Sequence, residues 1–196
     1  NNIHFTNNGS FGKEFKDTYE GSTYTHSLNT FKNSVTDTTI INNGDFYYGI
    51  YAYGGSGNLV ENNGNIYLDI ANTKSNSTEY ELVTNDFSQT KDGVLQIKVD
   101  NSIDANNPKY SQVYAQNIVL EDGTTIDFNV VKNPNEKLLV GQTLHNVIAI
   151  DDINKLNVNL NKLNITDNSA LLNFQAVLDT EANIDTAYGL DFNIVE

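Results

Sequence analysis

Two short segments, Ile40–Phe46 (IINNGDF) and Val60–Ile66 (VENNGNI), decide the fold that this sequence predicts. Each segment places the triplet Asn-Asn-Gly between apolar residues, and Gly64 follows Gly44 by 20 residues (64 − 44). This interval is close to the length of one coil of a parallel β-helix. Such a coil consists of about three short strands and three turns. Asn and Gly suit such turns because both tolerate left-handed backbone conformations. The triplet Asn7–Gly9 belongs to the same pattern.

The alternative is that Asn-Gly marks ordinary hairpins in a β-sandwich. The Asn content, 32 of 196 residues, favours the solenoid, because stacked coils reuse the same turn. Apolar and polar residues alternate in many places, whereas helical periodicity is almost absent. Each alternating segment predicts a strand with one buried and one solvated face. The clearest segments are Ile66–Ile70, Leu95–Val99, Ile126–Val130, Leu156–Leu160, Leu172–Leu178 and Leu190–Ile194.

Charge and composition exclude several classes of protein. The chain has 25 acidic and 11 basic residues, a net charge of −14, and every basic residue is Lys. Nucleic acid is therefore not an expected partner, because phosphate binding needs clustered Lys and Arg. The absence of Cys excludes disulfides and thiolate sites. It also suits a secreted chain that crosses an envelope unfolded.

The two ends of the sequence differ in pattern. Residues 1–75 are rich in Tyr, Thr and Gly and carry the triplets, which predicts regular β-helix coils. Residues 76–196 have longer alternating strands and more Asp, which predicts further coils and a C-terminal β cap. The polar stretch Lys74–Ser77 marks a soft boundary within one continuous solenoid. A cap is expected because an open solenoid end exposes core and strand edges.

From residue 92 onward the sequence resembles the C-terminal part of the passengers of bacterial type V autotransporters. Asp92–Asp100 (DGVLQIKVD) is similar to the family's G-x-L-x-V-x-V strand. Four further pieces follow in the family's order: Tyr110–Val113, Ile118–Phe128 (IVLEDGTTIDF), Val140–Ile148 (VGQTLHNVI) and Thr166–Phe174 (TDNSALLNF). The sequence departs from the family pattern at Tyr110, where Asp is usual, and at Asp122, which replaces the first of two paired glycines.

The resemblance implies a right-handed parallel β-helix that ends in a C-terminal cap, often called the autochaperone region. It also implies secretion through the outer membrane to the bacterial cell surface or the extracellular space. A membrane is then a partner only through a C-terminal barrel that lies outside this sequence. Because the sequence does not begin with Met, we expect a fragment of a longer protein.

Metal sites are not expected. Gly54–Val60 (GGSGNLV) resembles the calcium β-roll repeat G-G-x-G-x-D-x-U-x, but Leu59 occupies the Asp position and there is one copy. Calcium binds to several oxygen ligands, so we expect a glycine-rich turn here. The acidic pairs Asp151–Asp152 and Asp100 with Asp104 are expected to be solvated turn residues.

Catalytic residues and cofactors are not expected either. His4, His26 and His145 lie far apart without metal-binding spacing, and His145 is expected to be a hydrogen-bonded strand residue. The sequence has no G-x-S-x-G motif. Polysaccharide cleavage is the enzyme alternative, since glycoside hydrolysis needs two carboxylates on one face. Lyases of this fold often use an Arg or Lys base, and Arg is absent.

The densest aromatic stretch is Phe46–Tyr53 (FYYGIYAY). Alternation predicts Tyr47, Tyr51 and Tyr53 on one face, where exposed tyrosines suit the recognition of proteins or sugars. The alternative is an aromatic stack in the solenoid core.

The sequence therefore predicts a non-catalytic fragment of an autotransporter passenger that acts as stalk, folding nucleus and adhesin surface, with a role in virulence. Expected partners are a host-surface protein or glycan, or a second copy that binds through the β-helix faces. A fragment of a vacuolating-type secreted cytotoxin and a carbohydrate-active β-helix enzyme are the two alternatives.

Overall fold

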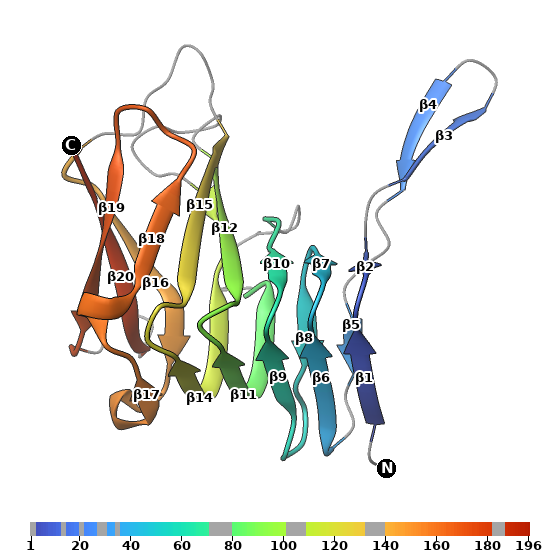
Figure 1. Cartoon of the computed structure of the whole chain (residues 1–196), viewed down its shortest axis with the longest axis horizontal. Coiled ribbons are helices and arrows are strands. Elements are labelled where there is room, and N and C mark those ends of the chain that lie inside the picture. Colours follow the sequence, from blue (N-terminus) through green and yellow to red (C-terminus); the bar gives the residue numbers. More distant parts are fainter. Residues whose placement is uncertain are drawn as a thin grey trace.

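The computed structural model describes residues 3–12, 15–19, 22–26, 31–33, 36–70, 80–100, 109–131, 140–181 and 187–196. These residues form a parallel β-solenoid of about three turns. Figure 1 shows the strands side by side along the long axis, with the N-terminal strands at one end and the C-terminal strands at the other. The prediction of an all-β parallel β-helix is confirmed, and the handedness of the coils stays a prediction.

The described residues place eleven strands in the larger of the two solenoid sheets. Its main path runs through β1 (Ile3–Asn7), β6 (Thr38–Asn42), β9 (Leu59–Asn62), β11 (Leu82–Gln89), β14 (Val113–Leu120), β16 (Thr143–Ile150), β20 (Tyr188–Val195) and β19 (Asn173–Asp179). Beside this path lie β5 (Phe31–Asn33), β8 (Ile50–Ala52) and β17 (Leu156–Asn157).

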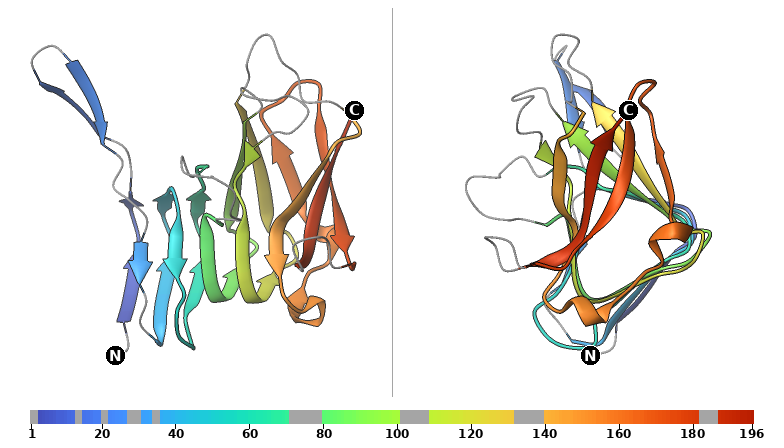
Figure 2. Two further views of the ribbon diagram at one scale, coloured as in Figure 1. Left: turned by 180° about the vertical axis from the view of Figure 1, so that it is seen from behind. Right: turned by 90° about the vertical axis from the view of Figure 1, so that its left-hand side faces the viewer.

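The smaller solenoid sheet has seven strands within the described residues. Its path runs through β18 (Asn164–Asp167), β15 (Thr125–Val131), β12 (Val94–Asp100), β10 (Asn65–Tyr67), β7 (Asp45–Tyr47) and β2 (Ser10–Phe11), with β13 (Lys109–Tyr110) beside β12. The right-hand view of Figure 2, along the long axis, shows the successive coils superimposed around one interior. A separate antiparallel hairpin, β3 (Phe15–Tyr19) and β4 (Ser22–His26), projects away from the coils (Figure 1).

Parallel pairing without register shifts stacks equivalent residues of successive coils. In the larger sheet Ile40 pairs with Val60, and Val60 pairs with Phe87. In the smaller sheet Ile66 pairs with both Phe46 and Leu95. All six side chains are buried and belong to one apolar core, which removes their surface from water. The same core continues through β14 and β15 to Phe192 and Ile194 near the C-terminus.

Three predicted alternating segments are confirmed in full. The apolar residues of Leu95–Val99 in β12, Ile126–Val130 in β15 and Leu190–Ile194 in β20 are buried, while most of their neighbours are partly exposed. Ile66–Ile70 forms a shorter strand than predicted, because β10 ends at Tyr67.

The strand predicted for Leu156–Leu160 is wrong. Only β17 is a strand there, and it lies between two single-turn 3₁₀ helices, η1 (Ile153–Lys155) and η2 (Leu160–Lys162). The carboxylate of Asp152 accepts a hydrogen bond from the Asn154 backbone N–H at 3.1 Å, which fixes the start of η1. Leu156, Val158 and Leu160 are nevertheless partly buried against the core, so the alternation of burial continues after the strand ends at Asn157.

The C-terminal strands pair in the opposite sense to the coils. β16 pairs with β20, and β20 with β19, in antiparallel order. In β19, Phe174 is buried, whereas Val177 and Leu178 are each 38% exposed because β19 is the last strand of the sheet path. A capping role for these strands stays a prediction. The boundary predicted at residues 74–77 lies outside the described residues.

Candidate functional site

The Asn-Asn-Gly turns stack into a buried column of amides, here called the inner amide ladder, formed by Asn7, Asn42, Asn62 and Gln89. Each side-chain N–H donates to the amide oxygen one coil further on, at 2.8, 2.9 and 3.2 Å in that order. All four residues are buried, so each bond forms where water cannot replace it. The ladder therefore ties four successive strands of the larger sheet, β1, β6, β9 and β11, together at one corner of the solenoid.

Each inner-ladder amide also donates to a backbone carbonyl of the following coil. The acceptors are the carbonyls of Asp45, Asn65, Val94 and Thr125, at 2.8 to 3.1 Å. The next position in register after Gln89 is Leu120, which is buried and apolar. The amide column thus ends at Gln89, and an apolar side chain takes the equivalent position in the next coil.

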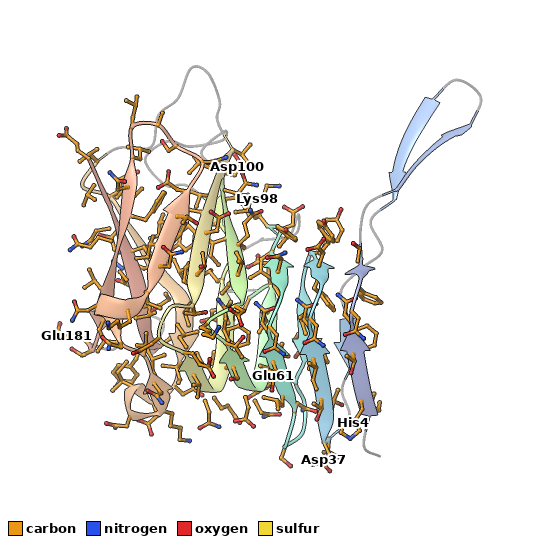
Figure 3. The ribbon with its side chains drawn as sticks, viewed as in Figure 1. His4, Asp37, Glu61, Lys98, Asp100 and Glu181 are labelled. Atoms are coloured by element: carbon orange, nitrogen blue, oxygen red, sulfur yellow. The ribbon has the colours of Figure 1, made fainter. Side chains whose placement is uncertain are left out.

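The second Asn of each triplet forms an outer amide ladder of Asn8, Asn43 and Asn63. Asn43 Nδ2 donates to Asn8 Oδ1, and Asn63 Nδ2 donates to Asn43 Oδ1, both at 2.9 Å and both exposed to solvent. Asn63 also donates to Glu61 at 2.8 Å, and Figure 3 labels Glu61 among these stacked coils. The two asparagines of each triplet thus supply one buried and one solvent-exposed row of amides.

The prediction that the triplet glycines serve a left-handed backbone is wrong for Gly44 and Gly64. Gly44 and Gly64 do not have positive φ, so tolerance of left-handed backbone is not what selects them. A Cβ atom on Gly44 would overlap the carbonyl oxygen of Gly9, and one on Gly64 would overlap that of Gly44. Close approach of stacked backbones therefore requires glycine at these turns.

The predicted tyrosine face does not form as one surface. Tyr47 lies in β7 of the smaller sheet, whereas Tyr51 lies in β8 of the larger sheet and Tyr53 directly follows it. The bend between β7 and β8 places Tyr48 at φ 77°, which breaks the alternation counted along the sequence. Tyr47 instead stacks on Tyr67 of the next coil, with ring centroids 4.8 Å apart.

Tyr53 belongs to a group that we call the tyrosine cluster, formed by Tyr53, Tyr80 and Tyr114. The Tyr114 ring lies 5.9 Å from Tyr53 in an edge-on arrangement and 5.3 Å from Tyr80 with planes 33° apart. Tyr114 donates its hydroxyl hydrogen to Asp151 Oδ2 at 2.6 Å. Burial, and then the bond to Asp151, raise the pKa of Tyr114 above its ordinary value.

The cluster is connected to a second row of amides, which is buried at Asn58 and Asn85 and partly exposed at Gln116. Asn58 Nδ2 donates to Asn85 Oδ1 at 2.8 Å, and Asn85 Nδ2 donates to Gln116 Oε1 at 2.9 Å. Gln116 Nε2 in turn donates to the Tyr53 hydroxyl at 3.3 Å. The cluster thus rests on a hydrogen-bonded scaffold that crosses three coils.

A histidine–aspartate pair lies at an irregularity between β16 and β20. His145 Nδ1 is 2.7 Å from Asp191 Oδ2, and Asp191 Oδ1 accepts from the Asn146 backbone N–H at 2.8 Å. Asp191 is buried and the His145 side chain is 59% exposed. Asn146 has φ 51° and a buried side-chain oxygen without a partner. His145 is therefore a hydrogen-bonded strand residue, as predicted.

The other residues singled out in the sequence are dispersed. His4, labelled in Figure 3, lies in β1, which four strands of the larger sheet separate from His145 in β16, and His26 lies in the projecting hairpin. Asp151 and Asp152 bind Tyr114 and the start of η1, respectively. Asp104 lies outside the described residues. In the part of the chain that the structure describes, no three His, Asp or Glu side chains gather in a metal-binding arrangement.

Gly54–Val60 is a turn followed by the start of β9, and Asn58 of this turn is buried in the second amide row.

One partly exposed ion pair, between Lys98 Nζ and Asp69 Oδ1 at 2.5 Å, links β12 to the segment after β10. Figure 3 labels Lys98 near the ends of the strands, beside Asp100. Exposed pairs of this kind contribute little to stability.

No protein-family model, curated protein sequence or solved structure matches this chain. Among the residues described above, none of the helical segments has the length and apolar character needed to span a membrane. The β-solenoid fold is thus established by the structure, and assignment to a family rests on the motifs of the sequence alone.

Proposed function

We propose that this chain is part of a bacterial autotransporter passenger and serves as a non-catalytic stalk, a folding nucleus and an adhesive surface. The observation that carries the proposal is the change in architecture along the solenoid. Parallel coils joined by amide ladders pass, at the C-terminal end, into the antiparallel strands β16, β20 and β19. This is the position at which the resemblance to autotransporters implies a cap.

An aromatic cluster near the C-terminus supports a C-terminal folding nucleus. Phe128 stacks on Phe174 with ring centroids 4.1 Å apart and meets Phe192 edge-on at 4.9 Å. The N-terminal coils place the inner amide ladder, instead of apolar side chains, at one buried corner. Because each coil of a solenoid contacts only its neighbours, the more apolar end is expected to fold first and to template the rest.

Native-state hydrogen exchange on the whole chain tests the nucleus. We expect the slowest-exchanging amides in β14, β15, β16 and β20, and faster exchange in β1 and β6. Slowest exchange in β1 and β6 would reverse the assignment.

The proposal that the chain belongs to an autotransporter passenger is tested separately, by sequencing the complete gene. A passenger requires that the same open reading frame also encode an outer-membrane translocator. A complete frame without one would remove the autotransporter proposal and leave the solenoid fold unaffected.

A further inference from the structure

The tyrosine cluster presents aromatic rings whose positions are fixed by the fold. Tyr53, Tyr80 and Tyr114 are each partly exposed, so their rings remain accessible at the surface. The Tyr114 hydroxyl is held by Asp151 and the Tyr53 hydroxyl by Gln116. A ligand that stacks on these rings therefore meets a surface with little side-chain freedom to lose.

The polar groups beside the rings suit hydroxyl groups. Asp151 is exposed, and a carboxylate accepts more hydrogen bonds than the one from Tyr114 occupies. Gln116 is partly exposed and carries both an N–H donor and a carbonyl acceptor. Aromatic faces flanked by amide and carboxylate groups match a sugar, which has an apolar ring face and a rim of hydroxyls.

Charge and apolar exposure select among possible ligands. The chain carries a net charge of −14, and the groups that bind the cluster hydroxyls are an amide and a carboxylate, so an anionic glycan would be repelled. The cluster offers aromatic faces, since its members do not include the large exposed aliphatic side chains of the described residues: Ile3, Val119, Val140, Leu171, Val177 and Leu178.

We propose that the tyrosine cluster is a stacking platform for a neutral oligosaccharide, with Tyr114 at its centre and with Gln116 and Asp151 binding sugar hydroxyls. The proposal rests on the adhesive role proposed above and names the ligand class of that surface. It involves binding alone and no bond cleavage.

The first step of the test is a glycan array probed with the whole chain. The array carries neutral glucose, galactose and mannose oligosaccharides beside acidic ones such as oligogalacturonate. We expect binding to neutral oligosaccharides and none to acidic ones. Binding confined to acidic oligosaccharides, or no binding to any neutral one, would overturn the proposal.

The second step measures the affinity for the strongest neutral oligosaccharide by titration. The chain contains no Trp, so intrinsic fluorescence reports on tyrosine directly. We expect Tyr114→Ala to weaken binding about tenfold or more, because it removes the central ring, and Tyr114→Phe to retain most of the affinity. A matched control is Tyr67→Ala, which removes a stacked tyrosine from the smaller sheet.

Equal affinity of Tyr114→Ala and the parent chain, or a larger loss in Tyr67→Ala, would contradict the assignment. Tyr53→Ala removes a ring at the edge of the cluster and keeps the test decisive if Tyr114→Ala does not fold. If neutral glycans fail to bind while the gene encodes a translocator, only the ligand assignment is wrong. Glycan binding without a translocator gene would instead remove the passenger class alone.

Discussion

Replacement of Asn42 by Ala tests whether the inner amide ladder holds the N-terminal coils together. Asn42 is fully buried, accepts a hydrogen bond from Asn7, and donates to the side chain of Asn62 and to the carbonyl of Asn65, at 2.8 to 3.0 Å. The substitution removes all three bonds and leaves the Asn62 side-chain oxygen without its donor. At about 1 kcal/mol for each bond and about 1–2 kcal/mol for the orphaned oxygen, we expect a loss of about 4–5 kcal/mol.

The next residue provides a matched control. Asn43 belongs to the same triplet and also makes two ladder bonds, with Asn8 and Asn63, but it is exposed. Water can replace those bonds, so Asn43→Ala is expected to cost less than about 1 kcal/mol. Urea unfolding followed by far-UV circular dichroism measures both free energies of unfolding. Equal losses in the two variants, or a larger loss for Asn43→Ala, would refute the role assigned to the buried ladder.

Four further substitutions test other parts of the structure. Gly44→Ala should destabilise the chain by at least about 1–3 kcal/mol because its Cβ would overlap the Gly9 backbone, whereas Gly9→Ala, with open space at its Cβ, should be nearly neutral in thermal unfolding. Phe174→Ala should cost about 3–5 kcal/mol in urea, since it empties a buried position stacked on Phe128, and a cost below that of an average surface substitution would contradict this. Burial raises the pKa of Tyr110 from 10.0 to about 12, so its contribution to stability is complete below pH 10 and lost as the pH rises toward 12. Tyr110→Phe should flatten that alkaline decline, and an unchanged pH profile would show that other groups cause it.

The sequence predicted the solenoid because its turns use nearly identical residues. Asn42 and Asn62 lie one coil apart in register, as the spacing of the triplets indicated. Strands with strict alternation, such as Leu95–Val99, were equally predictable, since burial of one face leaves a period of two. Leu156–Leu160 has the same period, yet only Leu156 and Asn157 pair with β14 before the chain enters η2, because periodicity alone does not show where strand pairing ends.

The tyrosine cluster could not be predicted because the coils differ in length. The inner ladder advances by 20 residues from Asn42 to Asn62 and by 27 from Asn62 to Gln89. Gln89 then pairs with Leu120, a further 31 residues along (120 − 89). Counting with a fixed repeat length therefore misaligns the residues of successive coils. Such a count could not place Tyr114 beside Tyr53. The pairing of Val83 with both Tyr51 and Tyr114 supplies the alignment that the sequence lacks.

The amide ladders and the apolar core serve different purposes in this solenoid. An apolar column gives stability but distinguishes poorly between one register and a shifted one, since similar aliphatic side chains recur at every second position. An inner-ladder amide has all its partners only when one side-chain amide stacks on another, and a shift by one residue would bury unpaired amides. The ladder therefore fixes the register of the N-terminal coils. Beyond Gln89, where Leu120 ends the ladder, the longer paired strands β12, β14 and β15 supply that specificity through their length.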